Sequence, residues 1–276
     1  MIKNEILLAS NDMELSGFYR QAENPIAATV LVHGFGEHIS RYDHVAEHFL
    51  KENISVIGVD LAGHGKSSGK KGHVNSIEDF YTCIDRMVDH VREDNKDLPL
   101  ILYGHSMGGN IALNYLISNE ESEFCCVLAT SSWLQLAIQP TALQLFLANT
   151  MNRVYPSLQQ KAALVFKDIS SVVEVQKDYE NDPLNHNKIS VRLFNEIYKN
   201  GLLAIEKASY IKLPMLISHG DDDNITSQEG SKAFAANNQQ ATLKIWPGLR
   251  HETHNEHNKE EVIEFYVAWA KNNIYS

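Results

Sequence analysis

The chain has 276 residues, 43% of them apolar, and a formal net charge of −11. Such a chain can bury a large core, and α/β sheets of this size often form one unit. The acidic balance argues against binding to nucleic acid, which favours a basic face, and against attraction to anionic membranes. Since the N-terminus lacks a signal-peptide pattern and no apolar run approaches about 18 residues, we expect a cytoplasmic protein without a membrane span.

Strand-like and helix-like segments alternate along the first half of the chain. Apolar residues on both sides of Asn11-Asp12 predict an opening antiparallel hairpin. Further strands are expected at residues 28–32, 54–59, 98–103 and 125–130, and helices at 41–51, 76–93 and 110–117. Ser76-Ile-Glu-Asp has the pattern of a capped helix start.

The alternation breaks between about Ser132 and Ser209, where no clear strand is expected and apolar residues recur at helical spacing. We interpret this segment as a helical insertion, or cap, over the carboxyl ends of the strands, where open α/β sheets bind ligands. A set of ordinary core helices is the alternative. Residues 135–148 are unusually apolar for a surface helix. This composition suits the wall of an apolar cavity or a transient contact with membrane or lipid.

Strands at 214–218 and 242–246 and a closing helix at 260–273 follow the insertion. Short apolar strands that alternate with longer helices predict an α/β protein, with a mainly parallel sheet of about eight strands covered by helices on both faces. The expected organisation is a core of residues 1–131 and 210–276 and a cap of residues 132–209.

Residues 104–109 read Gly-His-Ser-Met-Gly-Gly, between an expected strand and an expected helix. In this context Gly-x-Ser-x-Gly forms a strained turn that lifts the serine hydroxyl above the sheet. The glycines let strand and helix approach closely, and the helix N-terminus directs its amides toward the same place. Ser106 is therefore the predicted nucleophile, and a glycine-rich turn that happens to hold a serine is the alternative.

A serine hydroxyl needs a histidine that takes its proton and a carboxylate that orients the histidine, and each follows a later strand. Asp223 is the predicted acid because Asn224-Ile-Thr beyond it resembles a loop that descends into a helix. His251 is the predicted base because it is the histidine nearest the last strand. The alternatives are a solvated acidic turn, with the acid supplied elsewhere, and a histidine-rich metal site. His251-Glu-Thr-His254 is one residue short of the His-Glu-x-x-His zinc pattern.

Two backbone amides are needed to stabilise the oxyanion that forms during attack. One is expected from Met107, directly after the nucleophile, and the other from Phe35, in the loop that follows the strand at 28–32. The three cysteines, Cys83, Cys125 and Cys126, are expected as buried free thiols.

With these elements placed, the chain resembles the α/β-hydrolase superfamily over nearly its whole length. Within it, the chain is similar to the monoacylglycerol lipase and lysophospholipase-like branch, of the serine aminopeptidase S33 type. This narrower match rests on four stretches: His33-Gly-Phe-Gly-Glu-His-Ile-Ser-Arg-Tyr42, Asp60-Leu-Ala-Gly-His-Gly-Lys-Ser-Ser-Gly69, Lys71-Gly-His-Val74 and Gly104–Gly109.

The resemblance implies the triad Ser106, Asp223 and His251, with Phe35 and Met107 as oxyanion donors. It further implies that Glu37, Arg41 and His254 lie near a polar, glycerol-binding end of the pocket, with local salt bridging as the alternative. We expect a serine ester hydrolase that needs neither metal nor cofactor and cleaves a single-chain acyl ester, with a monoacylglycerol favoured. A short-chain carboxylesterase, a thioesterase, a lysophospholipase and a non-catalytic binding module are the alternatives.

Overall fold

The computed structural model describes residues 3–10, 13–119, 122–162 and 165–275. An eight-stranded sheet has the order β1-β2-β4-β3-β5-β6-β9-β10. Its strands are β1 (Lys3–Ser10), β2 (Met13–Arg20), β3 (Ala27–Val32), β4 (Ile54–Val59), β5 (Leu100–His105), β6 (Phe124–Thr130), β9 (Met215–Gly220) and β10 (Ala241–Trp246). The first two pair antiparallel as the predicted hairpin, and β2 runs antiparallel to β4, whereas the remaining pairs are parallel. The turn expected at Asn11-Asp12 lies outside the described residues.

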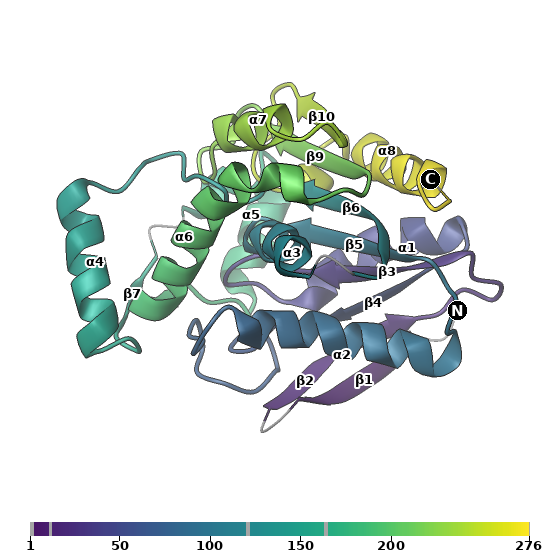
Figure 1. Cartoon of the computed structure of the whole chain (residues 1–276), viewed down its shortest axis with the longest axis horizontal. Coiled ribbons are helices and arrows are strands. Elements are labelled where there is room, and N and C mark those ends of the chain that lie inside the picture. The colour runs from purple at the N-terminus through teal and green to yellow at the C-terminus, as the bar shows by residue number, and fades with distance from the viewer. Residues whose placement is uncertain (1–2, 11–12, 120–121, 163–164, 276) are drawn as a thin grey trace.

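Helices cover both faces of this sheet (Figure 1). Side chains of α1 (Asp43–Lys51) and α8 (Lys259–Asn272) pack on one face. On the other face lie α2 (Glu78–Asp94), α3 (Met107–Ser118) and α7 (Gln228–Ala236). Every residue of β3, β4 and β5 is buried, as expected for parallel strands enclosed from both sides. The predicted α/β class and its mainly parallel sheet are confirmed.

The start of α2 differs from the expected capping pattern. Ile77 occupies the N-cap position and makes no side-chain cap hydrogen bond. Instead, the Asp79 carboxylate accepts the backbone N–H of Asn75 at 2.7 Å. The same carboxylate accepts the Ser76 N–H at 3.5 Å, which is the reciprocal bond of a capping box. The predicted start is therefore met only in part, because no side chain caps a helix amide.

Between β6 and β9 the chain forms α4 (Ala142–Val154), α5 (Val173–Asn181) and α6 (Val191–Glu206). Two short strands, β7 (Gln159–Lys161) and β8 (Lys188–Ser190), pair antiparallel in a separate sheet. The expectation of no strand in this segment is therefore wrong. Backbone hydrogen bonds of 2.8 Å tie the segment to the loops below it, from His186 N–H to Gly36 C=O and from Ser190 N–H to Gly72 C=O.

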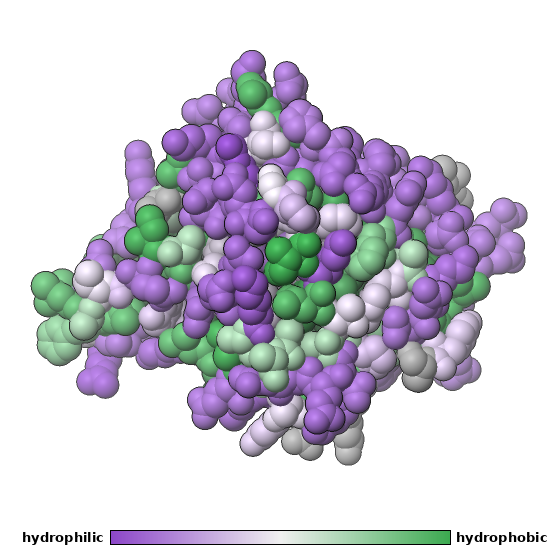
Figure 2. All heavy atoms as spheres, turned by 90° about the horizontal axis from the view of Figure 1, so that it is seen from above, coloured by the Kyte–Doolittle hydropathy of each residue, from purple (hydrophilic) through white to green (hydrophobic). Residues whose placement is uncertain are grey.

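The helix α4 stands apart from the sheet at one end of the molecule and packs against α6 (Figure 1). None of its residues is buried. Leu143 and Phe146 are 66% and 65% exposed. Figure 2 shows apolar side chains at this end of the molecule, and further apolar side chains near the middle of the same face. None of the helices in the described ranges combines the length and apolarity needed to cross a bilayer.

Candidate active site

Ser106 occupies the turn between β5 and α3, with φ of +54° and ψ of −117°. A positive φ is unfavourable for a residue with a Cβ atom, so the surrounding structure must hold this turn. The Ser106 N–H donates to the Thr130 carbonyl at 2.9 Å, and its own carbonyl accepts the Trp133 N–H at 2.9 Å. These bonds fix the serine at the carboxyl edge of the sheet.

Two glycines allow the turn to pack this tightly. A Cβ atom on Gly104 would lie 2.3 Å from the Gly108 carbonyl oxygen, and one on Gly108 would lie 2.1 Å from the Val32 carbonyl oxygen. Both distances are too short for two atoms that are not bonded to each other. A side chain at either position would therefore push α3 away from the sheet. The close approach anticipated from the Gly-His-Ser-Met-Gly-Gly motif is therefore present.

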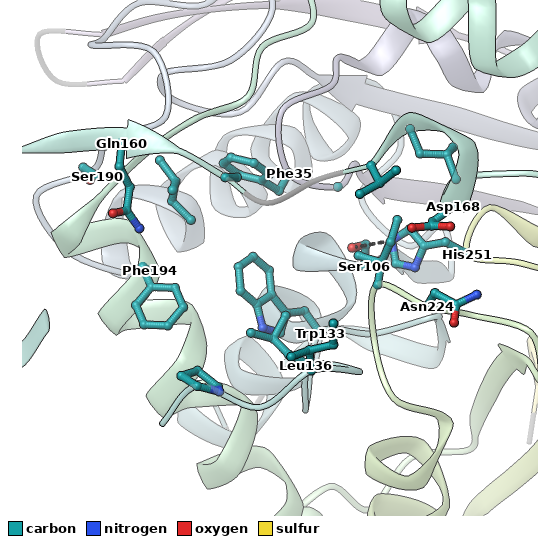
Figure 3. Close-up of a pocket in the computed structure, with 18 of the residues that line it drawn as sticks. Phe35, Ser106, Trp133, Leu136, Gln160, Asp168, Ser190, Phe194, Asn224 and His251 are labelled. Atoms are coloured by element: carbon teal, nitrogen blue, oxygen red, sulfur yellow. Dashed lines mark hydrogen bonds between the residues drawn. The ribbon is translucent and has the colours of Figure 1, made fainter. Parts of the chain in front are cut away.

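A chain of hydrogen bonds runs from Ser106 through His251 to Asp223. Figure 3 shows the first two of these side chains facing each other. The Ser106 Oγ lies 2.9 Å from His251 Nε2, and His251 Nδ1 lies 2.7 Å from Asp223 Oδ2. Asp223 lies in the loop after β9 and His251 in the loop after β10. With Nδ1–H donating to the carboxylate, Nε2 is left as an acceptor for the hydroxyl proton.

The Asp223 carboxylate is fully enclosed, with 0% of its side chain exposed. Its Oδ1 accepts the backbone N–H groups of Ile225 at 2.8 Å and Thr226 at 3.0 Å. Its Oδ2 also accepts the Thr226 hydroxyl at 2.8 Å and lies 3.0 Å from His219 Nε2. Burial alone would raise the pKa of Asp223, but the charge of His251 and the hydrogen bonds with His219 and His251 outweigh burial and hold the pKa below its ordinary value.

His219, which directly follows the strand expected at 214–218, was given no role from the sequence. In the structure it is fully buried, and its Nδ1 lies 2.8 Å from the Ser231 Oγ. Two imidazoles therefore face one carboxylate. A histidine four residues before a candidate acid, at the end of a strand, is the signal that could have identified it.

The pKa of His251 moves in the opposite direction from that of Asp223. Burial alone would lower it, but the adjacent Asp223 carboxylate stabilises the imidazolium and raises the pKa above the ordinary value of 6.5. A histidine with these neighbours can accept a proton from Ser106 and hold it as a stabilised cation.

The loop after β3 lies directly against Ser106. A Cβ atom on Gly34 would be 3.2 Å from the Ser106 Cβ. The Glu37 Oε1 accepts the Gly34 N–H at 2.6 Å and the Tyr42 hydroxyl at 2.7 Å, so the loop is braced from within. Within the described ranges, the N–H groups of Phe35 and Met107 donate to no protein acceptor. Both amides are therefore free for a ligand.

Glu37, Arg41 and Glu252 form an ion-pair cluster beside this loop. Arg41 makes two hydrogen bonds to the Glu252 carboxylate, at 2.6 and 2.7 Å, and a third to Glu37. Burial opposes ionisation of Glu37, but the charge of Arg41 lowers its pKa. The Arg41 guanidinium lies 4.6 Å from the centre of the Tyr179 ring. Local salt bridging, the alternative considered from the sequence, is present here.

His254 lies behind the site and is completely buried. Its ring stacks on Tyr42 at 5.0 Å and meets His105 edge-on at 4.8 Å. Burial holds its pKa well below the ordinary value, so it is uncharged. Among the described residues neither ring nitrogen has a hydrogen-bond partner.

A cavity of about 600 Å³ opens above Ser106 (Figure 3). Of the three residues predicted near its polar end, Glu37 lines it, whereas Arg41 and His254 do not. Arg41 is held between the carboxylates of Glu37 and Glu252, and His254 packs on Tyr42 behind the cavity wall, so a role of these two in substrate binding stays a prediction. The sequence did not identify the other polar side chains that line the cavity, which are Gln139, Gln144, Gln160, Asp168, Tyr179, Ser190, Asn224 and Glu252.

Most of the wall is apolar. Its apolar side chains come from the loop after β3 and from the segment between β6 and β9 above all: Phe35, Trp133, Leu136, Ile138, Pro140, Leu147, Ala148, Met151, Leu158, Ala162, Val165, Ile169, Ile189, Val191, Phe194 and Ile225. The volume lies within the range of pockets that enclose small organic ligands.

A mainly parallel sheet with a serine at a strained strand–helix turn defines the α/β hydrolases. Residues 23–258 match the family model described as serine aminopeptidase, S33. The chain belongs to this family, as the resemblance in its motifs implied, and it is a serine ester hydrolase that acts on small-molecule esters.

Relatives of this chain include lipases. Mouse (Mus musculus) monoglyceride lipase is 30% identical over 87% of this chain and 80% of its own length. The solved structure of Paleococcus ferrophilus monoacylglycerol lipase is 30% identical, with a TM-score of 0.87 and coverage of 94% of this chain and 99% of that one. An abhydrolase domain-containing protein of Dictyostelium discoideum is 33% identical over 91% of this chain, which spans 27% of that protein's length.

Proposed function

We propose that this enzyme hydrolyses single-chain acyl esters, with a monoacylglycerol as the favoured substrate. The proposal rests on the shape of the cavity, which has a mainly apolar part and a polar part beside His251. Its long apolar wall suits one acyl chain, and polar side chains beside His251 suit a hydroxylated alcohol. The names of the lipase relatives support the same substrate class. A cavity of about 600 Å³ is more than a short-chain ester needs, so the carboxylesterase alternative is less well supported.

In the proposed mechanism, Ser106 attacks the ester carbonyl while His251 takes the hydroxyl proton and Asp223 orients the imidazole. The N–H groups of Phe35 and Met107 stabilise the oxyanion, a contribution of about 3 kcal/mol for one donor in comparable sites. His251 then gives its proton to the leaving alcohol. Water, activated by His251, cleaves the acyl-enzyme and regenerates Ser106.

We further propose that residues 132–209 act as a cap on a core made of residues 1–131 and 210–276. Within this cap, α4 carries exposed apolar side chains next to the apolar wall of the cavity. A helix of this kind gains by burying its apolar surface in lipid. The predicted transient contact of the cap with membrane or lipid would use this helix.

The test is a chain-length series of monoacylglycerols measured beside p-nitrophenyl esters, each as dispersed and as emulsified substrate. We expect kcat/KM to rise from short to medium or long acyl chains, because each added CH₂ buries more apolar area in the wall. A further rise on emulsified substrate is expected if α4 meets lipid. If only short activated esters are cleaved, the monoacylglycerol proposal is wrong, although a serine esterase remains.

The pH dependence of kcat/KM should report on His251. As the general base it must be uncharged, and its pKa is raised above 6.5 by Asp223. Activity is therefore expected to fall as the pH falls through that raised pKa, with the midpoint of the acid limb above 6.5. A pH–rate profile on a p-nitrophenyl ester measures this limb. A midpoint below 6.5 would contradict the proposed pairing.

A further inference from the structure

The position of the leaving alcohol in the cavity follows from the position of His251. His251 delivers a proton to the leaving oxygen, so the alcohol must depart next to His251 Nε2. Figure 3 shows Asp168 and Asn224 beside His251, while Phe35, Trp133 and Phe194 lie along the opposite arm of the cavity, with the uncharged Gln160 and Ser190 at its far end. The apolar arm is then the acyl end, and the residues around Asp168 form the alcohol end.

The charged side chains at the alcohol end are nearly all of one sign. Three carboxylates line the cavity, those of Glu37, Asp168 and Glu252, and the described lining residues include no lysine or arginine. The histidine at position 105 adds no positive charge, because burial holds its pKa well below the ordinary value. His251 is the lining residue that gains a positive charge when it takes the Ser106 proton, and its uncharged form is the one that starts the reaction.

The nearest arginine is not available to a ligand. Arg41 directs its N–H groups to the carboxylates of Glu252 and Glu37, and the Tyr179 ring lies against its guanidinium. One arginine between two carboxylates leaves one negative charge uncompensated, and Asp168 adds another. Arg250, the next cation, bonds to the backbone carbonyls of Lys167 and Ser170 and pairs with Asp222 at 3.5 Å. It does not line the cavity.

We infer that the alcohol end selects esters by the charge of their leaving group: it accepts uncharged and cationic alcohols and rejects anionic ones such as glycerol phosphate. This inference rests on the proposed function. A phosphate at this end would lie among carboxylates in a partly enclosed site, where like charges repel strongly. It would also find no free guanidinium or ammonium donor among the described lining residues. A cationic alcohol would instead be attracted by these carboxylates.

The experiment compares kcat/KM for octanoyl esters of glycerol, glycerol phosphate and choline, at concentrations where all are dispersed. The p-nitrophenyl octanoate rate reports on the acyl end and the chemistry independently of any head group. We expect the glycerol and choline esters to exceed the glycerol phosphate ester by at least about 30-fold. Asp168→Asn should shrink this ratio several-fold. Asp178→Asn, an exposed carboxylate on α5 outside the cavity, is the matched control and should leave the ratio as it is.

The outcomes separate this inference from the proposed function. If the glycerol and glycerol phosphate esters are cleaved within about threefold of each other, the inference is overturned and the single-chain ester proposal stands. If the glycerol ester resists cleavage while p-nitrophenyl octanoate is cleaved, the monoacylglycerol proposal fails. The choline and phosphate esters then decide the inference: a large preference for choline supports it, and equal or absent rates overturn it. An unchanged ratio in Asp168→Asn contradicts the role given to that carboxylate.

Discussion

Replacing Ser106 by alanine is expected to lower kcat on both monoacylglycerols and p-nitrophenyl esters by about 10⁴-fold or more. Ser106 Oγ is the atom within 2.9 Å of His251 Nε2, and its removal leaves no group there that can form an acyl-enzyme. The remaining acceleration would come from the free amides and from binding. Burst kinetics with a p-nitrophenyl ester measure the loss directly, since the acyl-enzyme burst should vanish.

A matched serine on the same helix controls for this substitution. Ser118 is exposed at the end of α3, so Ser118→Ala should retain activity within about twofold. Thermal unfolding of both variants verifies that the fold is kept. Residual activity of Ser106→Ala above about 1% of wild type, free of contaminating esterase, would show that another group is the nucleophile.

Asp223→Asn is expected to reduce kcat by a similar amount, about 10⁴-fold. An asparagine amide at this place can donate to His251 Nδ1, which moves the imidazole proton to Nε2 and removes the acceptor that Ser106 needs. The loss of the negative charge also lowers the pKa of His251. The acid limb of any residual activity should therefore shift toward lower pH. Single-turnover rates across pH 5 to 9 would measure both effects.

The neighbouring aspartate makes this test specific. Asp222 is exposed and pairs with Arg250 at 3.5 Å, so Asp222→Asn should change kcat by no more than about twofold. Equal losses in the two variants would favour the alternative in which the acidic turn is only a solvated loop. An unshifted acid limb in Asp223→Asn would contradict the coupling between Asp223 and His251.

The parts of this protein that local chemistry determines could be predicted from its sequence. The turn at Ser106 depends on glycines within four residues of it, and the main strands are apolar runs bounded by turn residues. The structure brings Ser106, His251 and Asp223 within hydrogen-bond distance, although their catalytic roles stay predictions until variants are assayed.

Features that depend on distant contacts could not be predicted. Glu252 and Arg41 are separated by 211 positions, so no local pattern reveals that one neutralises the other. No role was predicted for His219, because its contact with Asp223 forms only when the loop between them folds back. The strands β7 and β8 have three residues each, too few for an alternating pattern to be recognised.

The side chains of the hydrogen-bonded triad and the apolar wall of the cavity come from different segments of the chain, and this separation affects how such enzymes can diversify. The side chains of Ser106, Asp223 and His251 follow strands of the main sheet, whereas most of the apolar wall comes from the segment between β6 and β9. Mutations in that segment can alter which acyl chain fits without disturbing the hydrogen bonds that run from serine to aspartate. Over generations, substrate range and chemistry can therefore drift at different rates, and descendants of one ancestral gene can serve different lipids with the same reaction.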